Sequence, residues 1–161
     1  MAEFRRFQKW VFGIWAAGIL MGCETDSIYA GSKAVLSENG WLASDTANFE
    51  WEVRDTLQRH DFFIDLRHDQ DYPFSNLYLF VDVTFPNGRQ LRDTVHCTLA
   101  DERGNWLGSG FGNIVDHRIG FRQSTAFPLT GEYRLSLVHG MRSNPLPGIL
   151  DVGFRLEQAG E

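Results

Sequence analysis

The sequence predicts an all-β protein, an antiparallel β-sandwich of roughly eight strands. From Trp41 onward, apolar and polar residues alternate with a period of two, which is typical of strands with one buried face. Turn-forming residues interrupt this alternation at short intervals, as they do in sandwiches. Helical periodicity is almost absent from the same region. Jelly-roll connections are one topology that this pattern allows.

The first half of the predicted sandwich contains three clear alternations, at residues 49–53, 62–66 and 77–85. In each, large apolar side chains occupy every second position, and the positions between include charged or polar residues, with aromatic residues at some of them. Pro86-Asn87-Gly88 follows the third. Because Asn-Gly tolerates the positive φ angles of a tight turn, this segment predicts a hairpin.

Asp101 to Asn105 forms the next predicted turn, and Gly108, Gly110 and Gly112 follow it. A phosphate-binding loop would require glycines that open a helix, whereas the flanking residues here are typical of strands. The glycines therefore indicate a bulge or a close backbone approach. The remaining strands are expected at residues 91–99, 114–121, 133–137 and 150–156.

The N-terminal residues are typical of a secretory signal peptide. Basic residues come first, and the uncharged apolar run Trp10–Leu20 follows them. Leu20-Met21-Gly22-Cys23 resembles the lipobox of bacterial lipoproteins. That resemblance implies cleavage after Gly22, recognised through Leu20 and Gly22, and lipid attachment to Cys23. The run is short for a transmembrane helix, but an uncleaved anchor or a buried first helix is the alternative interpretation.

Three regions follow from these patterns. Residues 1–22 are expected to form the lipoprotein signal peptide, with the apolar run as a helix. Residues 23–40 are polar and rich in small residues, which predicts a tether, although Tyr29 and Leu36 could dock on the folded part. Residues 41–161 are expected to form one sandwich domain, without an internal repeat.

The acidic balance of the chain excludes some classes of partner. The formal net charge is −6 for the whole chain, and removing the basic segment 1–22 makes the remainder more acidic. Nucleic acids and anionic lipid surfaces attract Lys and Arg, so the sequence predicts no nucleic-acid binding.

Cys97 is the second of two cysteines in the chain. If Cys23 carries lipid, Cys97 has no partner for an internal disulfide. Alternation places it beside Val95 and Leu99 on an apolar strand face, which predicts a buried, unreactive thiol. An intermolecular disulfide is the other interpretation.

Five histidines are present, but their spacing matches no metal-binding motif. His60 and His68 are expected at opposite ends of one strand, about 27 Å apart, too far to share an ion. His96 falls on a polar face. We therefore expect no metal, no cofactor and no catalytic residue. A hydrolase with a carboxylate pair remains a weaker hypothesis, because sequence cannot give the separation of two acids.

The chain is rich in aromatic residues, and most of them are expected in the core. Phe63, Tyr78 and Phe80 fall opposite the aliphatic faces of their strands. Burial under a second layer is the favoured interpretation, and an exposed patch that binds a partner is the alternative.

Several segments together resemble the GldH gliding-motility lipoprotein family of the Bacteroidota, in order and spacing. They are Tyr72–Leu79, Phe85–Gly88, Asp93-Thr94, Leu99–Asp101, Gly104–Gly108 with Gly110, Phe127-Pro128 with Gly131, Met141-Arg142, and Gly148-Ile149 with Asp151–Gly153. The lipobox fits as well. The resemblance covers nearly the whole chain after Cys23.

This resemblance implies an envelope lipoprotein required for gliding, a process coupled to type IX protein secretion, and it implies no enzymatic activity. The leading hypothesis is a non-catalytic, lipid-anchored scaffold or adaptor whose partners are other envelope proteins. The outer membrane, facing the periplasm, is the expected location. The alternative is a carbohydrate-binding surface lipoprotein, since exposed aromatic rings stack on sugars.

Overall fold

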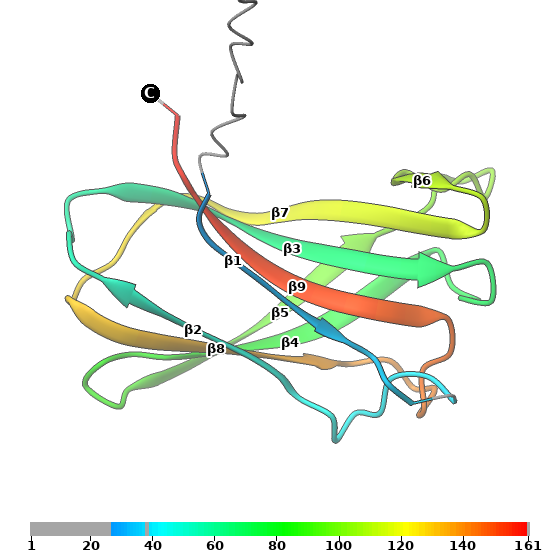
Figure 1. Cartoon of the computed structure of the whole chain (residues 1–161), viewed down its shortest axis with the longest axis horizontal. Coiled ribbons are helices and arrows are strands. Elements are labelled where there is room, and N and C mark those ends of the chain that lie inside the picture. The colour runs from blue at the N-terminus through cyan, green and yellow to red at the C-terminus, as the bar shows by residue number, and fades with distance from the viewer. Residues whose placement is uncertain (1–26, 38, 161) are drawn as a thin grey trace, which may run out of the picture.

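The computed structural model describes residues 27–37 and 39–160, and these residues form an all-β sandwich of two antiparallel sheets (Figure 1). One sheet has the order β1-β9-β3-β7-β6 and the other β2-β8-β4-β5. No helix long and apolar enough to cross a membrane occurs among the described residues. The strands are β1 (Ser27–Ala34), β2 (Ala47–Val53), β3 (Arg59–Asp69), β4 (Asn76–Thr84), β5 (Gln90–Thr98), β6 (Ser109–Phe111), β7 (Ile114–Ala126), β8 (Gly131–His139) and β9 (Ile149–Gln158).

The strand pairs are nested. The first strand pairs with the last, β2 pairs with β8, β3 with β7, and β4 with β5. Successive long strands from β1 to β4 alternate between the two sheets, as though one long hairpin had been wound around the core. This nested order is that of a jelly roll, so the structure confirms the predicted sandwich and shows which connections it uses.

The alternation in the sequence places one face of each strand in the core. In β2, Phe49, Trp51 and Val53 are buried, while the residues between them are exposed. Phe154 of β9 is fully buried and lies 5.1 Å from the Trp51 ring, centroid to centroid. Burying side chains of this size contributes about 1.5–3 kcal/mol each.

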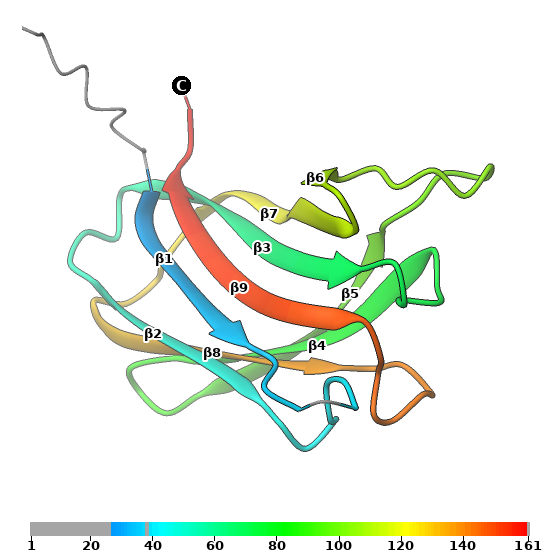
Figure 2. The ribbon, with the colours of Figure 1, turned by 45° about the vertical axis from the view of Figure 1, so that its right-hand side comes forward.

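Residues 27–34 belong to the sandwich, although the sequence assigned 23–40 to a tether. Strand β1 pairs with β9 through Ala34 and lies beside it in Figure 2. Tyr29 docks against Trp51 at a ring separation of 6.0 Å. Gly31 allows this, because a Cβ there would lie 2.6 Å from the Tyr29 hydroxyl. Half of β1 consists of Ala, Gly and Ser at residues 30–32 and 34, so it lacks the alternation of large apolar residues by which the other strands were recognised.

The predicted turns are present. Gly88 adopts a φ of +80°, and its amide donates to the Phe85 carbonyl at 2.8 Å, which closes the β4–β5 hairpin. The Asp101 carboxylate accepts hydrogen bonds from the amides of Arg103 and Asn105, both at 2.8 Å. These bonds lower the pKa of Asp101, with the Asn105 side chain as the largest cause.

The glycine-rich segment forms a short hairpin instead of a phosphate loop. β6 pairs with the first residues of β7, and Gly110 lies opposite Val115. A Cβ on Gly110 would collide with the carbonyl of Ile114, so the close backbone approach requires glycine. Gly112 makes the turn with a φ of +67°. The predicted close approach is therefore confirmed.

Candidate interaction surfaces

The residues assigned to lipidation lie outside the described part of the chain. Cys23, Leu20 and Gly22, and the whole predicted signal peptide at 1–22, precede Ser27, where β1 begins.

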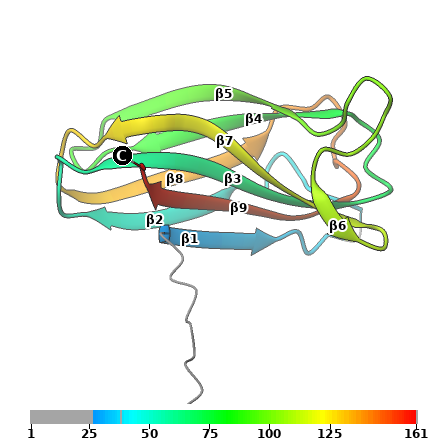
Figure 3. The same cartoon turned by 90° about the horizontal axis from the view of Figure 1, so that it is seen from above.

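Strand register gives the sandwich two distinct ends. Ser27 lies opposite Glu157, which in turn lies opposite Asp61. We call this the near end, because the N-terminal segment joins it. Asp69 pairs with Ile114 at the other end, which we call the far end. About 30 Å of β3 separates the two. In Figure 3 the start of β1 lies left of centre and β6 lies at the right.

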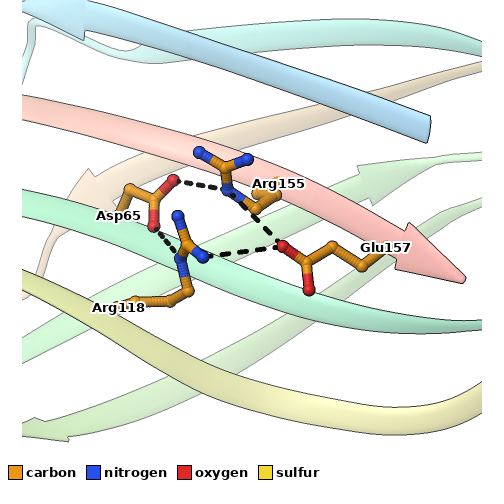
Figure 4. Close-up of polar contacts among 4 residues, drawn as sticks. All are labelled: Asp65, Arg118, Arg155 and Glu157. Carbon is orange, nitrogen blue, oxygen red and sulfur yellow. Dashed lines mark hydrogen bonds and ion pairs between the residues drawn. The ribbon is translucent and has the colours of Figure 1, made fainter. Parts of the chain in front are cut away.

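A network of four charged side chains covers part of the outer face of the five-stranded sheet (Figure 4). The Asp65 carboxylate accepts from Arg118 and from Arg155, each at 3.0 Å. Both arginines also approach Glu157, at 3.7 and 3.8 Å. Arg155 is the least exposed of the four, with 19% of its side chain accessible. Exposed pairs are worth about 0–1 kcal/mol, so the network fixes side-chain positions more than it stabilises the fold.

The same face continues as a polar hollow of about 570 Å³ toward the far end. Two residues that line it, Arg67 and Asp116, form an ion pair in which Arg67 donates at 2.7 Å. Asp151 also lines it, and burial raises the pKa of Asp151, opposed chiefly by the Arg67 charge. The acids Asp65 and Asp116 are thus held by guanidinium groups. This arrangement is typical of structural ion pairs and gives no support to the carboxylate-pair hydrolase hypothesis.

Two buried histidines meet in the core at the far end. His68 of β3 and His117 of β7 lie with their Nε2 atoms 3.0 Å apart. Trp106 packs edge-on against the His68 ring, with centroids 4.5 Å apart, and Tyr72 lies 5.3 Å from it. The sequence placed His60 and His68 at opposite ends of one strand, and the structure confirms this. It did not reveal the His68–His117 contact, which depends on strand pairing.

Hydrogen bonding fixes the tautomers of the pair. His68 Nδ1 lies 2.8 Å from the Asp69 carbonyl, so it carries a proton and donates. In neutral His68 the Nε2 is then an acceptor, and His117 Nε2–H donates to it. Burial, with the nearby His68 as a second cause, lowers the pKa of His117 to about 4. Among the described residues no group of three or more potential metal ligands converges.

The β6–β7 hairpin exposes large apolar side chains at the far end. Phe111 is 95% exposed and Leu107 is 60% exposed, and Ile114 is exposed next to them. Leu107 lies just before the hairpin, and Phe111 and Ile114 flank its turn. Single exposed apolar residues are common, but three within eight positions at the far end form a candidate contact surface. The spacing of the glycines drew attention to this segment in the sequence, and Phe111 was not singled out.

Tyr78 and Phe80 are 41% and 37% exposed on the outer face of the four-stranded sheet, so the favoured expectation of burial was wrong. No second layer covers this face in the described residues. The rings are partly covered by neighbours on β5. Tyr78 stacks on His96 at 4.7 Å, and the Arg92 guanidinium lies 5.7 Å from the centre of Phe80. Phe63 is partly buried.

Cys97 is buried on the inner face of β5, as the alternation predicted. Burial raises the pKa of its thiol to about 12. A thiol in this state is protonated and closed to solvent, so it acts as a small apolar side chain in the core.

The fold and these surfaces define a class of protein, a jelly-roll sandwich whose exposed features are contact surfaces and ion pairs. The family model for the GldH lipoprotein matches residues 28–156. A "gliding motility lipoprotein GldH homolog" of Christiangramia forsetii is 30% identical over 160 residues, covering 95% of this chain and 96% of that protein. The gliding motility lipoprotein GldH of Flavobacterium johnsoniae is 30% identical over 150 residues, covering 89% and 92%.

The chain therefore belongs to the GldH lipoprotein family. Among solved structures, the VP2 subviral particle of infectious bursal disease virus aligns with 83% of this chain and 31% of its own. That alignment has 12% identity and a TM-score of 0.29.

Proposed function

We propose that this protein is a non-catalytic lipoprotein of the gliding-motility apparatus, which acts as a scaffold or adaptor in envelope machinery linked to type IX secretion. Membership of the GldH lipoprotein family supports the envelope location, and the names of the two relatives support the link to motility. Its partners are the membrane, through a lipid, and other envelope proteins.

One observation carries the scaffold role, namely that the exposed apolar hairpin lies at the far end. The N-terminal segment joins the near end, and Phe111 and Leu107 occupy the opposite tip. A domain held to a membrane at one end and apolar at the other is arranged to hold a partner protein away from the bilayer.

The anchor is the proposed lipid on Cys23, added after cleavage behind Gly22 within the Leu20–Cys23 lipobox. Four residue steps separate Cys23 from Ser27, so an extended linker spans at most about 14 Å. The near end would then lie close to the bilayer surface. We place that bilayer as the outer membrane, with the domain in the periplasm.

The hairpin is tested with Phe111→Ser combined with Leu107→Ser in the native gene. Colony spreading and secretion of type IX cargo should fall, while protein abundance stays unchanged. Leu57→Ser is the matched control, because Leu57 is 88% exposed in the β2–β3 loop at the near end. Normal spreading and secretion by the double variant would count decisively against the hairpin as the partner surface.

The anchor is tested with Cys23→Ser. The variant should leave the lipidated membrane fraction, and its denaturation midpoint should match that of the parent, since all nine strands lie beyond residue 26. A variant that unfolds would show that the N-terminal segment is part of the domain instead of an anchor.

Carbohydrate binding is the second candidate, favoured by the exposure of Tyr78 and Phe80 on one strand. It predicts that Tyr78→Ala with Phe80→Ala weakens retention of the protein in polysaccharide affinity gels. Retention that is equal for parent and variant in every glycan tested would remove this candidate.

A further inference from the structure

The two sheets separate near one edge of the sandwich and leave an apolar cavity of about 230 Å³. The cavity lies between β5 and β7, which are neighbours across the sandwich but share no ladder. Leu91, on the inner face of β5, is 38% exposed and lies at the opening. Much of the wall is aromatic, with Phe62, Phe85, Phe121 and Phe127 all lining it.

An irregularity in β7 shapes this opening. Phe63 pairs with Gly120, but the next residue back, Phe62, pairs with Arg122, so β7 holds an extra residue at this point. A bulge of this kind redirects side chains and interrupts pairing. It also lies where Phe121 and Arg122 line the cavity. The local chain geometry, and not only a packing defect, therefore creates the space.

The backbone beyond the bulge is fixed in a strained conformation. Ser124 has a φ of +47°, an uncommon value for a residue with a side chain. Its amide donates to the Asp61 carboxylate at 2.7 Å, and its carbonyl accepts from Arg59 at 2.6 Å. Strain of this kind persists when neighbours hold it in place, and it is common at ligand sites.

The rim of the cavity is cationic. Arg122 reaches across from β7 and donates to Asp93 of β5 at 2.9 Å. Arg89 also lines the cavity, and among the described residues the cavity's ion pair is made by Arg122 and not by Arg89. Two guanidinium groups thus face one carboxylate, in a chain whose net charge is −6. A surplus of positive charge at an apolar opening is complementary to an anionic head attached to an apolar chain.

The cavity lies at the near end. Thr125, which lines the cavity, pairs with His60 at the start of β3. The next residue, Asp61, pairs with Glu157, and Glu157 pairs with Ser27 at the near end. Its position close to a bilayer rests on the anchor proposed at Cys23. The cavity and its rim do not depend on that anchor.

We propose that this cavity binds the acyl chain of a free fatty carboxylate. The end of the chain lies among the phenylalanine rings, and the carboxylate lies at Arg89 and Arg122. An engineered cavity of about 150 Å³ is enough to hold benzene, so this larger one accepts several methylene groups. Arg122 already pairs with Asp93 across the opening, so binding a ligand carboxylate there replaces one ion pair with another. The net attraction for the ligand carboxylate therefore comes from Arg89.

The test uses the full chain in phosphatidylcholine nanodiscs, titrated with octanoate by calorimetry, with empty nanodiscs as the blank. Octanoate should bind in excess of the blank. Val83→Phe, which fills the cavity, should weaken binding at least tenfold. Thr84→Phe adds a similar bulk on the other face of the same strand and should leave it unchanged. Leu91→Trp at the exposed opening is a second filling variant in case Val83→Phe fails to fold.

The head group is tested separately. Arg89→Met should weaken octanoate binding about three- to tenfold and leave the binding of 1-octanol unchanged. Folded filling variants that bind octanoate like the parent would overturn the proposal. So would native mass spectrometry that finds phosphatidylcholine in the cavity in place of octanoate. Neither result bears on spreading or secretion, so the scaffold proposal stands or falls independently.

Discussion

The two ends of the sandwich are built from different side chains. The near end is packed by an aromatic cluster of Trp51, Phe62, Phe127, Tyr133 and Phe154. The far end is packed by an imidazole cluster, which we define as His68 and His117 with the rings around them. Phenylalanine and tryptophan rings do not titrate, whereas a proton on a buried imidazole costs free energy. The near end also contains a buried histidine, His60, which packs on Phe127, but the His68–His117 contact occurs only at the far end. We therefore expect the stability of the far end to depend more strongly on pH.

The largest effect is expected from the aromatic cluster. Phe154→Ala should lower the free energy of unfolding by about 3–5 kcal/mol, because it leaves a cavity beneath Tyr29, Phe49 and Trp51. Phe111→Ala removes an identical ring from an exposed tip and should change it by less than about 0.5 kcal/mol. Urea denaturation measures both variants. Equal losses would mean that the far-end hairpin is buried in solution.

The second-largest effect on the free energy of unfolding is expected from acid, through the histidines at the far end. The pKa of His117 is about 4 in the folded protein, below its ordinary value of 6.5. The unfolded chain therefore binds the proton first, and stability present above pH 6.5 is lost as the pH falls toward 4. We expect a loss of roughly 1–3 kcal/mol over this interval, reduced from the full linkage value by solvent screening.

His117→Gln separates this effect from general acid unfolding. The variant should show a shallower dependence of the urea midpoint on pH between 7 and 4. Burial also lowers the pKa of His60 and of His139, so some dependence should remain. If the variant and the parent show the same dependence of the urea midpoint on pH, then groups other than His117 cause the acid sensitivity.

The smallest effect is expected from the ion-pair network, which belongs to neither cluster. Arg155→Met should cost roughly 0.5–1 kcal/mol, and Arg118→Met less, because Arg155 is 19% exposed and Arg118 51%. Both losses should shrink in high salt. A loss for Arg118→Met that approaches the one for Phe154→Ala would contradict the interpretation of this network as weakly stabilising.

The sequence predicted those features that depend on local pattern. Alternation identified the strands from Phe49 onward and the burial of Cys97, and Asn87-Gly88 identified a hairpin. β1 was not predicted because it lacks a clear alternation of large apolar residues, and its place in the sheet depends on pairing with β9. Tyr78 and Phe80 were assigned to the wrong environment, since alternation tells which residues share a face but not whether anything covers it.

Features that depend on register could not be predicted. The contact between His68 and His117 requires that β3 and β7 pair in one particular alignment. The cavity requires the extra residue in β7 opposite Phe62, and a bulge leaves no reliable mark in a single sequence. The candidate sites of this protein therefore arise from relations between strands rather than from motifs within them.

The pairing of β1 with β9 also constrains the order of assembly. A chain is delivered from its N-terminus, so β1 is the first strand to emerge and β9 the last. Within the described chain β1 has no other strand to pair with, and its partner Glu157 is 130 positions away from Ser27. Contacts this distant form late and slowly. The strand nearest the proposed anchor must therefore wait, unpaired, until almost the whole polypeptide has been delivered.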